Sequence, residues 1–62
     1  MRALGVRLNG KTIGVVVVPD GAGQREVARI VYRDCPVAYA AKPMVMLTRV
    51  GSLVVDLIVA VA

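Results

Sequence analysis

Apolar and polar residues alternate near the start of the chain in the way that is typical of β-strands. Within residues 3–8, one face carries the large aliphatic side chains and the other carries Arg7; the aliphatic residues are Leu4, Val6 and Leu8. Asn9-Gly10 follows, the dipeptide that best tolerates the positive φ angles of a two-residue hairpin turn. Residues 12–18 return as a second strand, because their valine run is too β-branched to favour a helix. The sequence therefore predicts a β-hairpin.

The segment 23–35 fits two patterns, and both stay open at this point. As a helix, it gathers its aliphatic residues on one stripe and places three arginines on the opposite side. Those arginines are Arg25, Arg29 and Arg33. As a strand, it leaves Val27 and Val31 among the arginines, which is the poorer alternation. The helix is the better fit, and Pro36 would end it.

Three further segments are predicted to be strands. Residues 37–41 and 44–49 are short candidates separated by Lys42-Pro43, and residues 53–61 are the strongest. One face of the last segment carries Leu53, Val55, Leu57, Val59 and Val61. Its other face is also mostly apolar, which is typical of a strand in the interior of a sheet. We expect it to pair with the strand at 3–8.

These elements predict one α+β domain spanning residues 1–62, with an all-β small barrel as the alternative. A chain of 62 residues is near the lower limit for an independent core. A disulfide within the monomer is excluded because Cys35 is the single cysteine, and the scattered acids with no histidine argue against a metal. We therefore expect no cofactor, no metal and no enzymatic activity.

Net charge, the apolar C-terminal segment and the few side-chain amides bear on where the protein is located and what it binds. The net charge of +4 permits binding to RNA or to an acidic protein. The apolar tail at 51–62 is too short for a membrane span and contains Asp56, and no signal peptide is visible, so we expect a cytoplasmic protein without membrane contact. Only Asn9 and Gln24 carry side-chain amides, which are lost chemically at high temperature; this predicts a thermophilic source.

Three short pieces of the sequence resemble the small sulfur-carrier proteins of thiamine and molybdopterin synthesis, which have the ubiquitin-like β-grasp fold. The segment 6–11 followed by 18–22 looks like their first hairpin and helix entry. Residues 37–40 look like their third strand, and residues 54–61 like their last strand. The resemblance implies a β-grasp domain with a hairpin first, one helix, short strands and a central last strand.

The sequence departs from that family where its chemistry takes place. The family works through a flexible C-terminal Gly-Gly, which threads an enzyme channel as bare backbone. Here the sequence reads Ala60-Val61-Ala62, and Gly51-Ser52 replaces the family's Gly-Asp turn. The resemblance therefore implies fold and descent, and an active sulfur carrier is expected only if a Gly-Gly tail is missing from this sequence.

Several candidate sites have a plainer structural interpretation. Cys35 near a helix C-terminus and without a histidine is better explained as a small buried apolar residue than as a reactive thiol. The segment 20–23 precedes a helix but lacks the glycine spacing of a phosphate loop, so it is better explained as a turn and helix cap. Ser52 has no histidine partner and cannot form a triad. Asp56 is either an outward-facing residue or the partner of an arginine.

Two sets of residues are the candidates for partner binding. The first is the arginine stripe of Arg25, Arg29 and Arg33, which could touch phosphates or an acidic partner. The second is the apolar face that one helix cannot cover, to which we assign Val16, Val18 and Ile58. We expect a homo-oligomer or a permanent complex through this face or an exposed strand edge. The leading function is a non-catalytic module that binds a protein; the alternative is a small basic accessory protein bound to RNA, for example on a ribosome.

Overall fold

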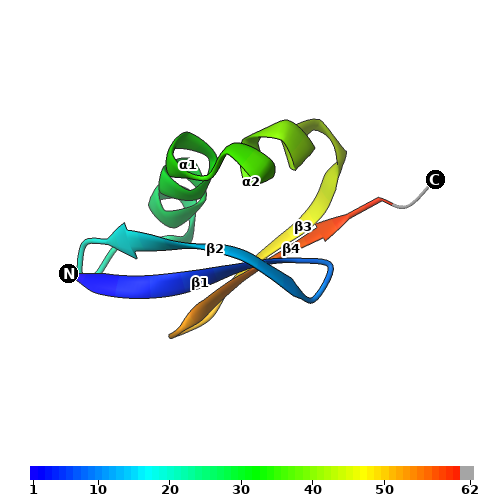
Figure 1. Cartoon of the computed structure of the whole chain (residues 1–62). Coiled ribbons are helices and arrows are strands. Elements are labelled where there is room, and N and C mark those ends of the chain that lie inside the picture. Colours follow the sequence, from blue (N-terminus) through cyan, green and yellow to red (C-terminus); the bar gives the residue numbers. More distant parts are fainter. Residues whose placement is uncertain (61–62) are drawn as a thin grey trace.

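The computed structural model describes residues 1–60 as a mixed sheet of four strands and two helices (Figure 1). In chain order the elements are β1 (Arg2–Leu8), β2 (Lys11–Val18), α1 (Gln24–Asp34), α2 (Pro36–Ala41), the 3-10 turn η1 (Lys42–Met44), β3 (Val45–Val50) and β4 (Val54–Val59). Both helices lie on the same side of the sheet (Figure 1). The α+β prediction is confirmed, and the all-β barrel is wrong.

The sheet order is β2-β1-β4-β3, so the last strand is interior as predicted. It runs parallel to β1 and antiparallel to β3, and β1 is antiparallel to β2. The strand β4 ends at Val59, and the predicted position of Val61 lies outside the described residues. Leu53, which we placed in the last strand on the same face as Val55 and Leu57, precedes β4 and is 73% exposed, so that prediction is wrong. Its carbonyl accepts a hydrogen bond from the Gly5 amide instead.

The β1–β2 connection is the predicted two-residue turn. Asn9 has a φ angle of 49° and Gly10 one of 84°, the left-handed values that this pair tolerates. The Asn9 side chain also extends the sheet, because its Oδ1 accepts from the Val59 amide at 2.8 Å and its Nδ2 donates to the Val59 carbonyl at 3.4 Å. One residue therefore makes the hairpin turn and ties it to the end of β4.

The ambiguous segment is the helix α1, so the helical interpretation is confirmed. Val27, Ile30 and Val31 are its buried residues. Cys35 ends the helix with extended backbone angles, and Pro36 follows at the first position of α2, where a missing amide proton costs no hydrogen bond.

The predicted strand at 37–41 is wrong, because this segment belongs to α2. Three alanines favour a helix here, and Ala38 is small enough to be completely buried against the core. The other short strand is confirmed, since β3 covers Val45–Val50. Pro43 lies in the 3-10 turn between them.

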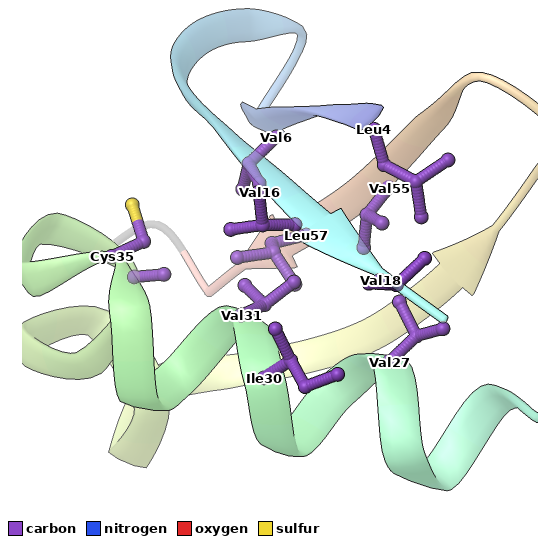
Figure 2. Packing of buried hydrophobic residues seen from close by; sticks show 11 residues of the cluster. Leu4, Val6, Val16, Val18, Val27, Ile30, Val31, Cys35, Val55 and Leu57 are labelled. Atoms are coloured by element: carbon purple, nitrogen blue, oxygen red, sulfur yellow. The ribbon is translucent and has the colours of Figure 1, made fainter. Parts of the chain in front are cut away.

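The core lies between the helices and one face of the sheet (Figure 2). Its buried residues are Leu4, Val6, Val16, Val18, Val27, Ile30, Val31, Cys35, Ala38, Val55 and Leu57. None of the buried residues in the described part is polar or charged. The helices thus cover one face only, and the opposite face of the sheet stays open.

Candidate functional site

The open face of the sheet is defined by residues on each strand whose side chains point away from the helices. Val15 and Val17 on β2 are 67% and 54% exposed, and Ile58 on β4 is 39% exposed. Leu47 lies directly opposite Ile58 in the β3–β4 ladder and is also exposed. We use the name "open face" for these four residues and the charged row between them.

Val16 and Val18 do not lie on this face, so our assignment of them was wrong. They are 3% and 0% exposed and point toward α1 in Figure 2, beside Val27 and Val31. The error has a physical reason in the β1–β2 ladder, whose register shifts between Val6 and Arg7. Such a bulge inserts one residue and breaks strict alternation.

The bulge lies at Ile13, since Val6 pairs with Gly14 and Arg7 with Thr12. Ile13 packs against the core, although simple alternation places it on the same face as Val15 and Val17. The inserted residue reverses the alternation of β2 at this position. If Ile13 is assigned to the core and strict alternation is continued from it, the four valines at 15–18 are placed on the wrong faces. Ile58 is on the open face as predicted, because the neighbouring register shift inserts its extra residue in β3, between Val45 and Leu47, and leaves the alternation of β4 intact.

A charged row crosses the middle of the open face. The Arg7 guanidinium donates two hydrogen bonds to the Asp56 carboxylate, from Nε at 2.6 Å and from Nη2 at 2.8 Å. These two residues are paired in the parallel ladder, and Arg49 is opposite Asp56 on its other side. Asp56 is therefore both outward-facing and an arginine partner, the two alternatives that we left open.

The hydrogen bonds from Arg7 hold the pKa of Asp56 below its ordinary value of 3.8. Partial desolvation of the carboxylate opposes this effect, and the charges of Arg7 and Arg49 add to it. Asp56 in turn raises the pKa of Arg7, mainly through the same hydrogen bonds. The pair is therefore ionised at neutral pH, and Arg49 is the cation of the row that forms no salt bridge within residues 1–60.

The arginine stripe lies on the exposed side of α1, opposite its buried residues. Arg33 donates to Asp34 from Nε at 2.8 Å and from Nη2 at 3.1 Å, and the nearest Arg29–Glu26 distance is 4.0 Å. Hydrogen bonds from Arg33 lower the pKa of Asp34. Two of the three cations are thus already offset by neighbouring carboxylates, and Arg25 has no salt bridge within residues 1–60.

A hollow of about 510 Å³ lies at the first turn of α1, lined by Gly23, Arg25, Glu26 and Arg29. Two arginines would attract an anion there, but the Glu26 carboxylate lies in the same hollow and opposes it. Gly23 caps the helix without a side-chain hydrogen bond, so the segment 20–23 is a turn and a cap rather than a phosphate loop.

Each carboxylate side chain of the sequence is already paired. Asp20 lies 3.1 Å from the N-terminal ammonium, and the other three pairs are Arg7–Asp56, Arg29–Glu26 and Arg33–Asp34. Within residues 1–60, the side-chain cations outside these pairs are Arg2, Lys11, Arg25, Lys42 and Arg49. The surface thus presents an excess of unpaired positive charge.

The remaining candidates are structural. Cys35 is a buried free thiol, consistent with a small core residue. Among residues 1–60, no three side chains of the metal-binding types come together, and no helix has the length and apolarity to cross a membrane. Neither a catalytic group nor a cofactor cradle is brought together in the described part of the chain.

Comparisons with known proteins add no neighbour. No family model, no curated protein and no solved structure matches this chain. The candidate surfaces are therefore the open face and the arginine stripe as the geometry presents them. Sequence reasoning missed Val15, Val17 and the pairing of Arg7 with Asp56, because each depends on strand register.

Proposed function

We propose that this chain is a non-catalytic binding module that uses the open face to hold a protein partner. The observation that carries the proposal is the exposure of Val15, Val17 and Ile58 on a face of the sheet that no element within residues 1–60 covers. These residues form two groups, Val15 with Val17 on one side of the charged row and Ile58 on the other. Exposed apolar side chains bordered by polar residues are typical of interaction sites. A core of this size also gains stability from a second buried surface.

The fold supports the same proposal. We infer a β-grasp domain, since a hairpin, a helix and a last strand parallel to β1 follow one another in the order that the sulfur-carrier resemblance implied. Domains of that group act by being bound, which fits a chain whose described residues assemble no catalytic set.

The chemistry of the open face defines the partner. Its apolar residues flank a charged row in which Asp56 is already satisfied by Arg7, and Arg49 has no acidic side chain within salt-bridge distance. The row therefore carries a net positive charge. A complementary protein surface presents aliphatic side chains on both sides of a carboxylate that meets Arg49. Arginine at the centre of an apolar interface is a frequent energetic hot spot.

Affinity capture followed by calorimetry on the purified partner tests this function. The wild-type chain and the Ile58→Lys variant serve as baits, because Ile58 lies on the interior strand and its change leaves both sheet edges intact. The matched control replaces Arg25, Arg29 and Arg33 together with Gln. We expect the control to keep wild-type affinity and Ile58→Lys to weaken binding at least about tenfold.

The charge of the partner is tested on the same complex. Arg49→Glu should weaken binding, and replacing the opposing carboxylate of the partner with Lys should restore it. A partner that binds Ile58→Lys and the wild-type chain equally well would overturn the proposal.

RNA binding is the second candidate, favoured by the cations that form no salt bridge in the part of the chain that the structure describes, among them Arg25 and Lys42. Phosphate binding releases counterions, so its affinity falls steeply with salt. RNA binding predicts strong heparin retention, a steep salt dependence and loss of both in the triple Gln variant. If the variant with Gln at positions 25, 29 and 33 kept the heparin retention and its salt dependence, RNA binding through the arginine stripe would be contradicted.

A further inference from the structure

The two edge strands of the sheet, β2 and β3, differ in how well they are protected against pairing with another strand. We call a protected edge closed. At the β3 edge, the Gln24 side chain on α1 donates a hydrogen bond to the Thr48 carbonyl at 3.0 Å. The β3–β4 register also shifts between Val45 and Leu47, which places a bulge at Met46. A capped carbonyl and a bulge are features that prevent another strand from pairing with an edge. The β3 edge is therefore closed.

The β2 edge has no such protection along most of its length. Within the described residues, β2 pairs with β1 alone, and no side chain donates to its backbone. Between Thr12 and Val18 the strand contains neither a charged residue nor a proline, and its single bulge lies near its start, at Ile13. An exposed, uncharged, β-branched edge is a template for strand addition.

The free backbone groups of this edge can be assigned. The Gly5 amide donates to the Leu53 carbonyl at 2.9 Å, so the backbone of Gly5 points toward β4. Backbone groups alternate in direction along a strand, and in an antiparallel ladder non-bonded pairs alternate with bonded ones. Gly5 is opposite Val15, and Ala3 is opposite Val17. The N–H and C=O groups of Val15 and Val17 therefore point away from β1, toward the free edge.

We propose that β2 pairs in antiparallel fashion with β2 of a second copy of this chain. The register that uses these groups centres on Val16. Val15 of each copy then lies opposite Val17 of the other, and each such pair exchanges both of its backbone hydrogen bonds. The two sheets become one continuous sheet, with all helices on the same side.

Three features select a second copy as the occupant. Lys11 begins β2 and Asp20, whose carboxylate lies 3.1 Å from the N-terminal ammonium of its own chain, follows the end of β2. Antiparallel self-pairing therefore brings Lys11 of each copy near the exposed Asp20 of the other. The exposed Val15 and Val17 side chains of both copies meet on the open face, where β-branched cross-strand pairs are favourable. The closed β3 edge then stops further addition, so the assembly ends at a dimer.

Sedimentation equilibrium from micromolar to millimolar concentration tests the dimer. Val17→Pro removes the outward amide and keeps an apolar side chain, and proline is tolerated on an edge strand when its nitrogen faces solvent. We expect the wild type to dimerise and Val17→Pro to raise the dissociation constant at least about tenfold, as the loss of about 1.4 kcal/mol requires. Met46→Lys, on the closed edge, is the matched control and should dimerise like the wild type.

Disulfide trapping reads the register even if Val17→Pro fails to fold. A Val15→Cys chain mixed with a Val17→Cys chain should form the mixed dimer faster than either chain links to itself, because the bonded pair has a Cα separation of about 5.5 Å, within disulfide range. Met46→Cys should not cross-link.

A wild type that stays monomeric at millimolar concentration would overturn the proposal, as would trapping at position 46 in place of 15 and 17. The proposed protein-binding function is separable from this result. Ile58→Lys changes the open face without touching the β2 edge. Val17→Pro removes the outward amide of the edge and keeps an apolar side chain at the open-face position of Val17.

Discussion

The run of four valines in β2 provides a direct test of which sheet face is buried. Val16 and Val18 are in the core and Val15 and Val17 are on the open face, so four identical residues alternate between two environments. Replacing each valine singly with threonine preserves side-chain shape and β-branching. The four variants therefore differ in the burial of one hydroxyl group.

The expected cost follows from the composition of the core. None of the buried residues in the described part is polar or charged, so a hydroxyl at position 16 or 18 is surrounded by apolar side chains. The loss of one buried methyl group costs about 0.8 kcal/mol. An unpaired hydroxyl adds roughly 1–3 kcal/mol. We expect Val16→Thr and Val18→Thr to lose about 2–4 kcal/mol of unfolding free energy, and Val15→Thr and Val17→Thr to change by about 0.5 kcal/mol or less.

Urea unfolding followed by circular dichroism measures the four values, at low micromolar concentration so that self-association does not contribute. Domains of this size have a total stability of roughly 3–9 kcal/mol, so the core variants should remain measurable but show clearly lower midpoints. In a thermal scan the same loss corresponds to a decrease in Tm of about 8–30 °C. If Val15→Thr and Val17→Thr proved to be the costly pair, the bulge at Ile13 and the assigned faces would be wrong.

Two further predictions concern the interactions that β4 makes with the side chains of Asn9 and Arg7. Asn9→Ala should destabilise the fold by about 1–2 kcal/mol, because alanine is strained at a φ angle of 49° and cannot replace the hydrogen bonds to Val59. Asn9→Gly relieves the strain but also lacks these hydrogen bonds, so it should recover part of the loss in the same urea assay. Since Arg7 holds the pKa of Asp56 below its ordinary value, the stability from this pair is present above that value and is lost as pH falls through the lowered pKa. Thermal scans from neutral pH to pH ~2 should therefore show a smaller acid-induced decrease in Asp56→Asn than in the wild type, and equal decreases would contradict the assignment.

Local patterns were sufficient to predict the hairpin, α1 and the interior position of the last strand. Asn9-Gly10 determines its own turn, and a strand apolar on both faces is stable only inside a sheet. The arginines of α1 could be assigned to one side because a helix has a single period. These features depend on residues that are close in the sequence.

The errors arose where the outcome depends on contacts distant in sequence. Residues 37–41 alternate well enough for a strand, but Pro36 starts a helix and Ala38 is completely buried in the core. The bulge at Ile13 is set by pairing with β1 and reverses the face that simple alternation assigns to Val16 and Val18. The pairing of Arg7 with Asp56 requires the parallel β1–β4 register, which no local pattern specifies.

The two proposed interfaces reinforce one another physically. Val15 and Val17 carry both the free backbone groups of the β2 edge and the most exposed side chains of the open face. A dimer joined at β2 doubles the apolar area at the join and places two copies of the Arg7–Asp56–Arg49 row on the same side. A protein that binds across this join contacts both chains and therefore stabilises the dimer by mass action. Partner binding should accordingly shift the sedimentation profile toward complexes that contain two copies of this chain. Binding through the α1 arginines would leave the equilibrium between monomer and dimer unchanged.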